Sequence, residues 1–307
     1  MAIRLRITLG DPRGIGPEVT ATALRALRRE LPGVEVGLHG VDVRGVLDVR
    51  PISEVDFDGS EPSAGRVAGT AIESAVHAIL AGEADALVTA PIHKPALRAA
   101  GWDEPGHTEL LMRLTGAPRV GMLMAAERTR LGGALRVLLA TTHVALRDVP
   151  TLLTADRIED QTRLLVRELE ERFGIATPRV ALCALNPHAS DAGLFGDEEA
   201  RIYAPALDRL ADLDVVGPLP ADTVFSRALA GEFDAVVAPY HDVGMAAFKT
   251  VSFGSGVNTT LGLPFPRTSP DHGTAFDRVG TSEIDASSML AALRLAVRMA
   301  GASHPRP

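Results

Sequence analysis

Short apolar runs alternate along this chain with longer segments whose apolar positions repeat at the helical period. The runs IRLRITLG, VEVGLHG and DALVTAP have the length and the composition of β-strands. The segments TATALRALRREL and GRVAGTAIESAVHAILAG place apolar residues three and four positions apart, as amphipathic helices do. Strands that alternate with helices in this way predict an α/β protein with a largely parallel sheet.

Later segments continue the alternation, with features of their own. The stretch RVGMLMAAERTRLGGALRVLLATT contains two apolar runs split by a charged turn, which predicts a hairpin or two successive strands. Residues 149–174 predict one long helix ended by Gly174, and residues 286–300 predict a C-terminal amphipathic helix. Residues 240–280 are rich in glycine and proline, so we expect much of this segment to be loop.

Composition and charge restrict the class of protein. Of the 307 residues, 46% are hydrophobic and 23% are charged, and the net charge of −8 argues against a nucleic-acid partner. No apolar run has the length of a membrane span, so no membrane partner is expected. The opening MAIRLRITLG is too short and too charged for a signal peptide, which makes the cytoplasm the expected location. The single cysteine, Cys183, excludes an internal disulfide.

The first predicted strand leads into a glycine-rich turn and a helix, GDPRGIGPEV. This turn is neither the GxGxxG fingerprint nor a P-loop, so it does not identify a nucleotide. It can present helix N-terminal N–H groups to an anion, or it can be a tight structural turn. The sequence leaves both interpretations open.

Cationic and polar side chains follow several of the predicted strands. His93 and Lys94 follow the strand DALVTAP, and a cationic pair at a strand end indicates a site. His107 and Thr108 begin a predicted helix, where the histidine can donate to an anion and the threonine can be an N-cap. Residues 240–280 add further groups that suit a phosphorylated, acidic substrate, namely Lys249, Asn258 and Arg267.

Three histidines share one context, because each follows an apolar strand at its exit. They are His143 after VLLATT, His188 after VALCALNP and His241 after AVVAPY. Strand exits of one parallel sheet converge on one crevice, so the three imidazoles can meet around one divalent metal. Three protein ligands leave open positions, as catalytic sites do. The chain has no HExxH motif, which disfavours a zincin-type peptidase.

The ordered motifs of the chain resemble the 4-hydroxythreonine-4-phosphate dehydrogenase (PdxA) family of pyridoxal phosphate biosynthesis. The resemblance covers nearly the whole chain and is carried by GDPRGIGPE, TAPIHK, PGHTE, TTH, LNPHA, GPLPADT, YHD, GVNTTLGLPF and RTSPDHGTAFD. It implies two α/β/α lobes with a cleft between them, in the manner of isocitrate and isopropylmalate dehydrogenases. The expected lobes are residues 1–125 plus 262–307 and residues 126–261. It also implies a homodimer with active sites at the dimer interface.

The resemblance also implies roles for individual residues. One divalent metal per subunit, Zn²⁺, Mg²⁺ or Co²⁺, would be held by His143, His188 and His241. The substrate would contact His107, Thr108, Lys249, Asn258 and Arg267. The tail DHGTAFDRVG is similar to the adenosine-side loop of isopropylmalate dehydrogenases, which assigns NAD or NADP to His272, Gly273, Thr274 and Asp277. Lys249, Asp222 and Asp242 are the candidates for catalysis, and the two aspartates can also serve as a loop cap and a turn residue.

The implied reaction is metal-dependent oxidation of 4-phosphohydroxy-L-threonine to a β-keto acid, which decarboxylates to 3-amino-2-oxopropyl phosphate. An alternative is oxidative decarboxylation of D-threonate or D-erythronate 4-phosphate by the same residues. A metal-dependent hydrolase and a non-catalytic metabolite-binding protein are further alternatives. The chain departs from the family pattern at Arg13, where Ala is expected, at Val243, where Gln is common, and in the run SFGSG. These departures bear on pocket shape and substrate choice.

Overall fold

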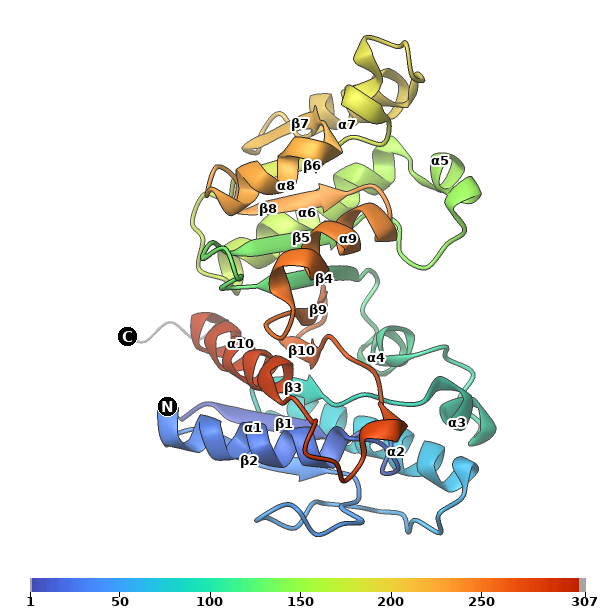
Figure 1. Cartoon of the computed structure of the whole chain (residues 1–307), viewed down its shortest axis with the longest axis vertical. Helices are drawn as coiled ribbons and strands as arrows, with labels where there is room; N and C mark the ends of the chain where they lie inside the picture. Colours follow the sequence, from blue (N-terminus) through green and yellow to red (C-terminus); the bar gives the residue numbers. More distant parts are fainter. Residues whose placement is uncertain (1, 304–307) are drawn as a thin grey trace. The chain divides into compact units, whose positions relative to one another are not determined.

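A computed structural model describes residues 2–303 of the chain (Figure 1). The fold divides into two compact units. Unit 1 contains the described residues up to Val120 and those from Val257 onward, and unit 2 is Gly121–Gly256. Unit 1 is therefore built from both ends of the chain, whereas unit 2 is continuous in sequence.

Unit 1 contains five strands in the order β2-β1-β3-β10-β9. Pairings β1–β2, β1–β3 and β3–β10 are parallel, and β9 runs antiparallel to β10. The strands come from distant parts of the sequence and are β1 (Arg4–Thr8), β2 (Glu35–His39), β3 (Ala86–Thr89), β9 (Val257–Leu261) and β10 (Arg267–Pro270).

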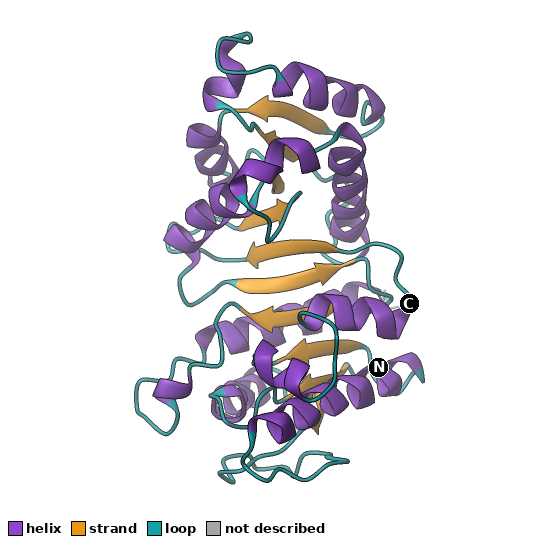
Figure 2. Cartoon of the chain, turned by 90° about the vertical axis from the view of Figure 1, so that its right-hand side faces the viewer, coloured by secondary structure: helices purple, strands orange, loops and turns teal. Residues whose placement is uncertain are grey.

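Helices lie on both faces of the unit 1 strands (Figure 2). Helices α1 (Gly16–Glu30) and α10 (Ser287–Ser303) contact each other, and α10 packs on β3, β9 and β10. Helix α2 (Glu61–Leu80) packs on β1, β2 and β3 and contacts α3 (Lys94–Ala99) and α4 (His107–Thr115). A short 3-10 turn, η4 (Phe276–Arg278), precedes α10. The apolar faces of α2, β3 and α4 form one buried core, which includes Ile72, Leu87 and Leu110.

Unit 2 contains five strands in the order β4-β5-β8-β6-β7. Strands β4 (Gly121–Ala126) and β5 (Leu135–Leu139) pair antiparallel, which confirms the predicted hairpin. The pairings β5–β8, β8–β6 and β6–β7 are parallel. These strands are β6 (Val180–Cys183), β7 (Val215–Leu219) and β8 (Ala235–Ala238).

The helices of unit 2 also cover both faces of its strands. Helices α8 (Ala221–Leu229) and α9 (His241–Ser252) pack on β5 and β8, and their core includes Val137, Phe225 and Phe248. Helix α6 (Ala155–Glu171) contacts β4 and α7 (Ala204–Arg209), and α7 contacts β7. The remaining short segments are η1 (Leu146–Asp148), α5 (Val149–Leu152), η2 (Pro187–Asp191) and a π-helical turn, η3 (Glu199–Tyr203).

The predicted α/β fold is confirmed, and so is the C-terminal helix. The prediction that residues 240–280 are mostly loop is wrong, because this segment contains α9, β9 and β10. Gly244 does not break α9, because its position requires the absence of a side chain. A Cβ on Gly244 would lie 2.8 Å from Cδ2 of Leu139 and 3.0 Å from Cβ of Ala238. Close packing of helix on sheet therefore explains this glycine.

The predicted single helix over residues 149–174 is also wrong. It is divided into α5 and α6, because Leu153 is extended and Thr154 starts a new helix. The hydroxyl of Thr154 accepts a hydrogen bond from the backbone N–H of Arg157 at 3.1 Å, which is an N-cap.

The glycine-rich turn after β1 is held by close backbone contacts. Gly10 has φ +72°, and a Cβ there would lie 2.1 Å from the carbonyl oxygen of Pro91. A Cβ on Gly16 would lie 2.1 Å from the carbonyl oxygen of Leu9. Both positions therefore require glycine for steric reasons. Between residues 2 and 303, no helix has the length and apolar character that crossing a membrane needs.

Candidate active site

The three strand-exit histidines follow three neighbouring strands of unit 2. Strands β5, β8 and β6 are adjacent and parallel, and His143, His241 and His188 follow them in that order. His241 is the first residue of α9 and follows β8, the central strand of the three. The strand placement predicted from the sequence is therefore present.

His143 and His241 lie side by side. Their ring centroids are 5.3 Å apart, and the ring planes are inclined by 44°. Imidazole nitrogens bind Zn²⁺ at about 2.0–2.1 Å, so two imidazoles on one tetrahedral ion have centroids roughly 5 Å apart. The observed spacing fits two ligands of one metal. The donor type, imidazole nitrogen, suits Zn²⁺ and Co²⁺ better than Mg²⁺.

Asp242 orients one imidazole of this pair. Its Oδ1 lies 2.7 Å from Nδ1 of His241. A carboxylate at Nδ1 favours the tautomer that carries its proton there and leaves the lone pair on Nε2. The second ring nitrogen of His241 is thus the available metal ligand. This contact favours an orienting role for Asp242 over a role as a simple turn residue.

His188 lies in an unusual backbone segment. Residues 188–192 all have positive φ, from 48° to 64°, although none is glycine. The backbone just before this segment is anchored by hydrogen bonds. The buried carboxylate of Glu199 accepts the backbone N–H groups of Leu185 and Asn186 at 3.0 and 2.8 Å. Within residues 2–303 no group of three His, Cys, Asp or Glu side chains is arranged to hold a metal. The structure therefore brings His143 and His241 together and leaves the three-ligand set a prediction.

Arg267 of unit 1 is a buried cation held by neutral partners. It is 2% exposed. Its Nη1 donates to the hydroxyl of Thr260 at 2.9 Å, and its Nη2 donates to the hydroxyl of Thr89 at 2.5 Å. Nε of Arg267 has no hydrogen-bond partner within the described part of the chain. Burial lowers the pKa of the guanidinium to about 10, so the group is still charged at neutral pH. A buried cation without a carboxylate is suited to receive an anion.

His107 lies close to this cation. Its Nε2 is buried and has no hydrogen-bond partner among residues 2–303. Burial lowers the pKa of His107 well below its usual value, and the charges of Arg267 and Lys94 lower it further. The imidazole is therefore neutral and carries one N–H. Thr108 follows it in the first turn of α4, and it does not cap the helix, because Gly106 is the N-cap residue.

The other predicted substrate contacts are divided between the units. Asn258 lies on β9 opposite Ser269, and Thr260 lies opposite Arg267, so Asn258 and Arg267 share one face of the sheet. Lys249 is exposed in the last turn of α9 in unit 2. Asp222 is exposed in the first turn of α8.

The predicted cofactor loop of unit 1 packs against the glycine-rich turn. The carbonyl oxygen of Thr274 accepts the N–H of Ile15 at 3.0 Å. Nδ1 of His272 lies 3.0 Å from the carbonyl oxygen of Gly273, and no atom lies within 4 Å of the position a Cβ on Gly273 would take. Asp277 is exposed in η4. The loop thus offers an open glycine next to Thr274, which contacts the turn after β1, and the exposed Asp277 carboxylate pairs with Arg278 at 3.7 Å.

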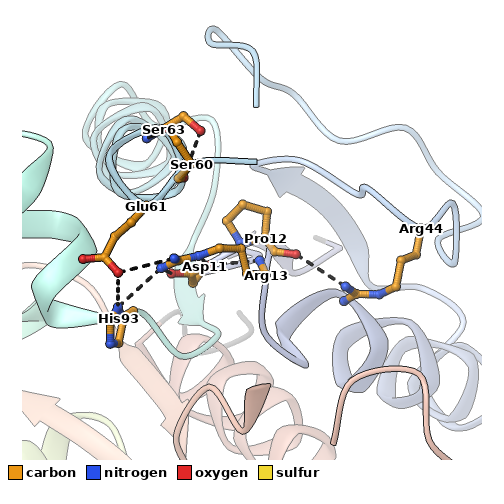
Figure 3. A network of polar contacts seen from close by, with 8 residues as sticks. All are labelled: Asp11, Pro12, Arg13, Arg44, Ser60, Glu61, Ser63 and His93. Carbon is orange, nitrogen blue, oxygen red and sulfur yellow. Dashed lines mark hydrogen bonds and ion pairs between the residues drawn. The ribbon is translucent and has the colours of Figure 1, made fainter. Parts of the chain in front are cut away.

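Sequence reasoning missed a polar network around the glycine-rich turn (Figure 3). The guanidinium of Arg13 lies 3.5 Å from Oε2 of Glu61 and 3.4 Å from Nδ1 of His93, and it binds the Asp11 carboxylate. It also stacks over the ring of Phe276, at 5.3 Å from the centroid. The only signal in the sequence was the departure from the family pattern at Arg13.

Solved structures define the class of the protein. The chain matches the crystal structure of 4-hydroxythreonine-4-phosphate dehydrogenase from Klebsiella pneumoniae with a TM-score of 0.79 and 36% identity, covering 98% of both chains. It shares its fold with isocitrate dehydrogenase from Methylococcus capsulatus, at a TM-score of 0.53 and 13% identity, covering 98% of this chain and 86% of that one. The chain is thus an oxidoreductase, and the predicted likeness to isocitrate dehydrogenase is confirmed.

The sequence comparisons specify the family. A relative from Desulfosudis oleivorans named 4-hydroxythreonine-4-phosphate dehydrogenase is 43% identical over 334 residues, covering 98% of this chain and 97% of the relative. Residues 14–296 match the family described as pyridoxal phosphate biosynthetic protein PdxA. The chain belongs to the PdxA family.

Proposed function

We propose that this protein catalyses the metal-dependent, NAD(P)-linked oxidation of 4-phosphohydroxy-L-threonine. The resulting β-keto acid decarboxylates to 3-amino-2-oxopropyl phosphate, a step of pyridoxal phosphate biosynthesis. The observation that carries this proposal is the buried guanidinium of Arg267, whose partners are hydroxyl groups. A substrate with anionic groups supplies the negative charge that this cation lacks.

The substrate has two anionic groups, a phosphate and a carboxylate. Arg267, Asn258 and Lys249 bind them. His107 donates its single N–H, because the low pKa keeps the imidazole neutral. Thr108, in the first turn of α4, adds a hydroxyl and a backbone N–H group.

One divalent ion per subunit, Zn²⁺, Mg²⁺ or Co²⁺, is held by His143, His241 and His188. When bound, it acts as a Lewis acid that favours the ionised alcohol and polarises the ketone. The spacing of His143 and His241 fits two of the ligands. We propose a homodimer with shared active sites.

The remaining residues orient a ligand imidazole, transfer protons or bind the cofactor. Asp242 holds the His241 ring through Nδ1. Asp222, exposed at the start of α8, and Lys249 are the candidates for proton transfer at the substrate. His272, Gly273, Thr274 and Asp277 hold the adenosine side of NAD or NADP, which accepts the hydride when bound.

A substrate comparison tests the proposal. Metal-loaded protein is assayed for formation of reduced nicotinamide with 4-phosphohydroxy-L-threonine, D-threonate 4-phosphate and D-erythronate 4-phosphate, each with NAD and NADP. A preference of at least tenfold in kcat/KM for the amino acid substrate is the expected result. A preference for a sugar acid phosphate would move the protein to carbohydrate catabolism with the same chemistry. No reduction with any substrate would refute the dehydrogenase proposal.

A further inference from the structure

The basic residues of this chain are almost all arginines. Of 31 Lys and Arg residues, two are lysines, Lys94 and Lys249. Lys249 is already one of the proposed substrate contacts. Lys94 is the lysine whose position has still to be explained.

The position of Lys94 is not explained by helix stability. It is the first residue of α3, where a positive charge opposes the helix dipole. It is exposed, and no ion pair joins it to a carboxylate within residues 2–303.

Lys94 extends across the start of a second helix. A Cβ placed on Gly106 would lie 3.4 Å from Cε of Lys94 and 4.0 Å from its Nζ. Gly106 is the N-cap of α4, and no side chain caps this nine-residue helix. The ammonium group therefore lies beside uncapped N–H groups, where a helix attracts anions. The nearest carboxylate is that of exposed Glu109, whose Oε2 lies 3.6 Å from the same Cβ position.

Two buried nitrogen atoms are further candidates to bind a ligand here. Nε2 of His107, the first residue of α4, and Nε of Arg267 have no hydrogen-bond partner in the described part of the chain. Lys94 reaches Gly106, which precedes His107, and the charges of Arg267 and Lys94 both lower the pKa of the His107 imidazole. Two positive charges and a set of free donors, with one exposed carboxylate nearby, fit a doubly charged ligand.

We infer that Lys94 is a further substrate-binding residue, whose ammonium group binds the phosphate of the substrate at the N-terminus of α4 together with His107 and Arg267. The inference rests on the proposed function, because it takes the substrate to be a phosphomonoester. Lysine suits this task as a compact point charge with three donors, whereas Arg267 and the helix supply fixed directions.

Direct binding of inorganic phosphate tests the inference without turnover. Titration calorimetry compares the wild type with Lys94→Met and with Arg98→Met, an exposed cation on the same short helix. Lys94→Met should weaken phosphate binding about 10- to 100-fold, the range for a hydrogen bond to a charged group. Arg98→Met should bind phosphate as the wild type does. Wild-type affinity in Lys94→Met, equal losses in both variants, or no phosphate binding by the wild type would overturn the inference.

Kinetics separate this inference from the proposed function. With the phosphorylated substrate that the wild type prefers, Lys94→Met should raise KM about 10- to 100-fold and leave KM for the nicotinamide cofactor unchanged. Lys94→Arg, which keeps the charge, should recover part of the loss. A wild type that turns over no phosphorylated substrate would refute the proposed function, while the phosphate titration would still judge Lys94. An unchanged KM in an active Lys94→Met variant would refute only the role of Lys94.

Discussion

Arg13 and Asp11, two positions apart in the glycine-rich turn, form a two-pronged ion pair. Nε of Arg13 donates to Oδ1 of Asp11 at 3.0 Å, and Nη2 donates to Oδ2 at 2.8 Å. The Asp11 side chain is 1% exposed, whereas that of Arg13 is 24% exposed. The arginine thus neutralises a buried carboxylate and at the same time covers Phe276 of the predicted cofactor loop.

Replacing Arg13 by Ala should destabilise the protein, because it leaves the Asp11 carboxylate buried with one backbone donor. We expect the free energy of unfolding to fall by about 2 kcal/mol, below the full cost for a buried pair because Arg13 is partly exposed. The double variant D11N/R13A should recover part of this loss. Urea denaturation measures both, with R66A as the control, since Arg66 pairs with Asp58 on the surface at 3.9 Å. Equal stabilities of R13A and R66A would contradict the role of the pair.

Removing one histidine of the neighbouring pair should remove the metal. His143→Ala should lose bound metal, measured by elemental analysis per subunit, and should lose turnover, while its unfolding midpoint without metal stays that of the wild type. His77→Ala serves as the control, because His77 is exposed on α2 in unit 1. Full metal content in His143→Ala would show that the ring near His241 is not a ligand.

Replacing Asp242 and replacing Asp222 should have different effects on metal affinity. Asp242→Ala should weaken metal affinity about 10- to 100-fold, because the His241 ring loses its orienting carboxylate. Asp222→Ala should keep wild-type metal affinity, and its kcat should fall if Asp222 transfers a proton. Competition with a metal chelator measures the affinities. Unchanged affinity in Asp242→Ala would remove the orienting role.

Replacing Arg267 by Met should abolish function without weakening the fold. The buried guanidinium has no carboxylate partner among residues 2–303, so its removal leaves no unpaired charge. Apolar replacement of buried charges is often neutral or stabilising. We expect an unfolding free energy within about 1 kcal/mol of the wild type and at least a 100-fold loss of kcat/KM. Unfolding of the variant under native conditions would show that Arg267 is a structural residue instead.

His39 should make stability depend on pH. Burial lowers the pKa of its imidazole to about 4, with a smaller contribution from Arg6. The His39 imidazole therefore binds a proton near pH 6.5 in the unfolded state but only near pH 4 in the folded state. The contribution of neutral His39 to the free energy of unfolding is fully present above pH 6.5. As pH falls toward 4 this contribution is lost, and the free energy of unfolding falls by about 3 kcal/mol.

Urea denaturation between pH 4.5 and 7.5 compares the wild type with H39N. The variant should lose less stability over this range, because it lacks the group that titrates. Parallel pH profiles for the two proteins would exclude His39 as the cause. The comparison is insensitive to any constant cost of the substitution, including loss of the 3.1 Å contact between Nδ1 and the Ser74 hydroxyl.

Local pattern was sufficient to predict the strands that precede His143, His188 and His241. Each of these strands is a short apolar run, and parallel neighbours put their ends at one edge of the sheet. Strands β9 and β10 were missed because VNTTL and RTSP are not apolar runs. The helix that begins at His241 was missed because residues 240–280 are rich in glycine and proline, whereas Gly244 permits close approach to Leu139 and Ala238. This glycine is explained only by the strands against which α9 packs, β5 and β8.

Contacts between distant positions could not be predicted from pattern. Arg267 and Thr89 are 178 residues apart, and Arg13 and His93 are 80 apart. Nothing in the local sequence says which hydroxyl accepts from Arg267 or that Phe276 lies over Arg13. The residue types of the site were visible in the sequence, and their partners were set by the pairing of β10 with β3 and the packing of the cofactor loop.

The division of unit 1 between the two ends of the chain sets an order of events during synthesis. Unit 2 has all its strands once Gly256 has left the ribosome, whereas unit 1 still lacks β9, β10 and α10. Lys94 and His107 then exist without Arg267, and β3 has one side open. The proposed anion site is therefore among the last parts of the protein to form, and a chain that stops before β10 has its histidine pair but no buried guanidinium.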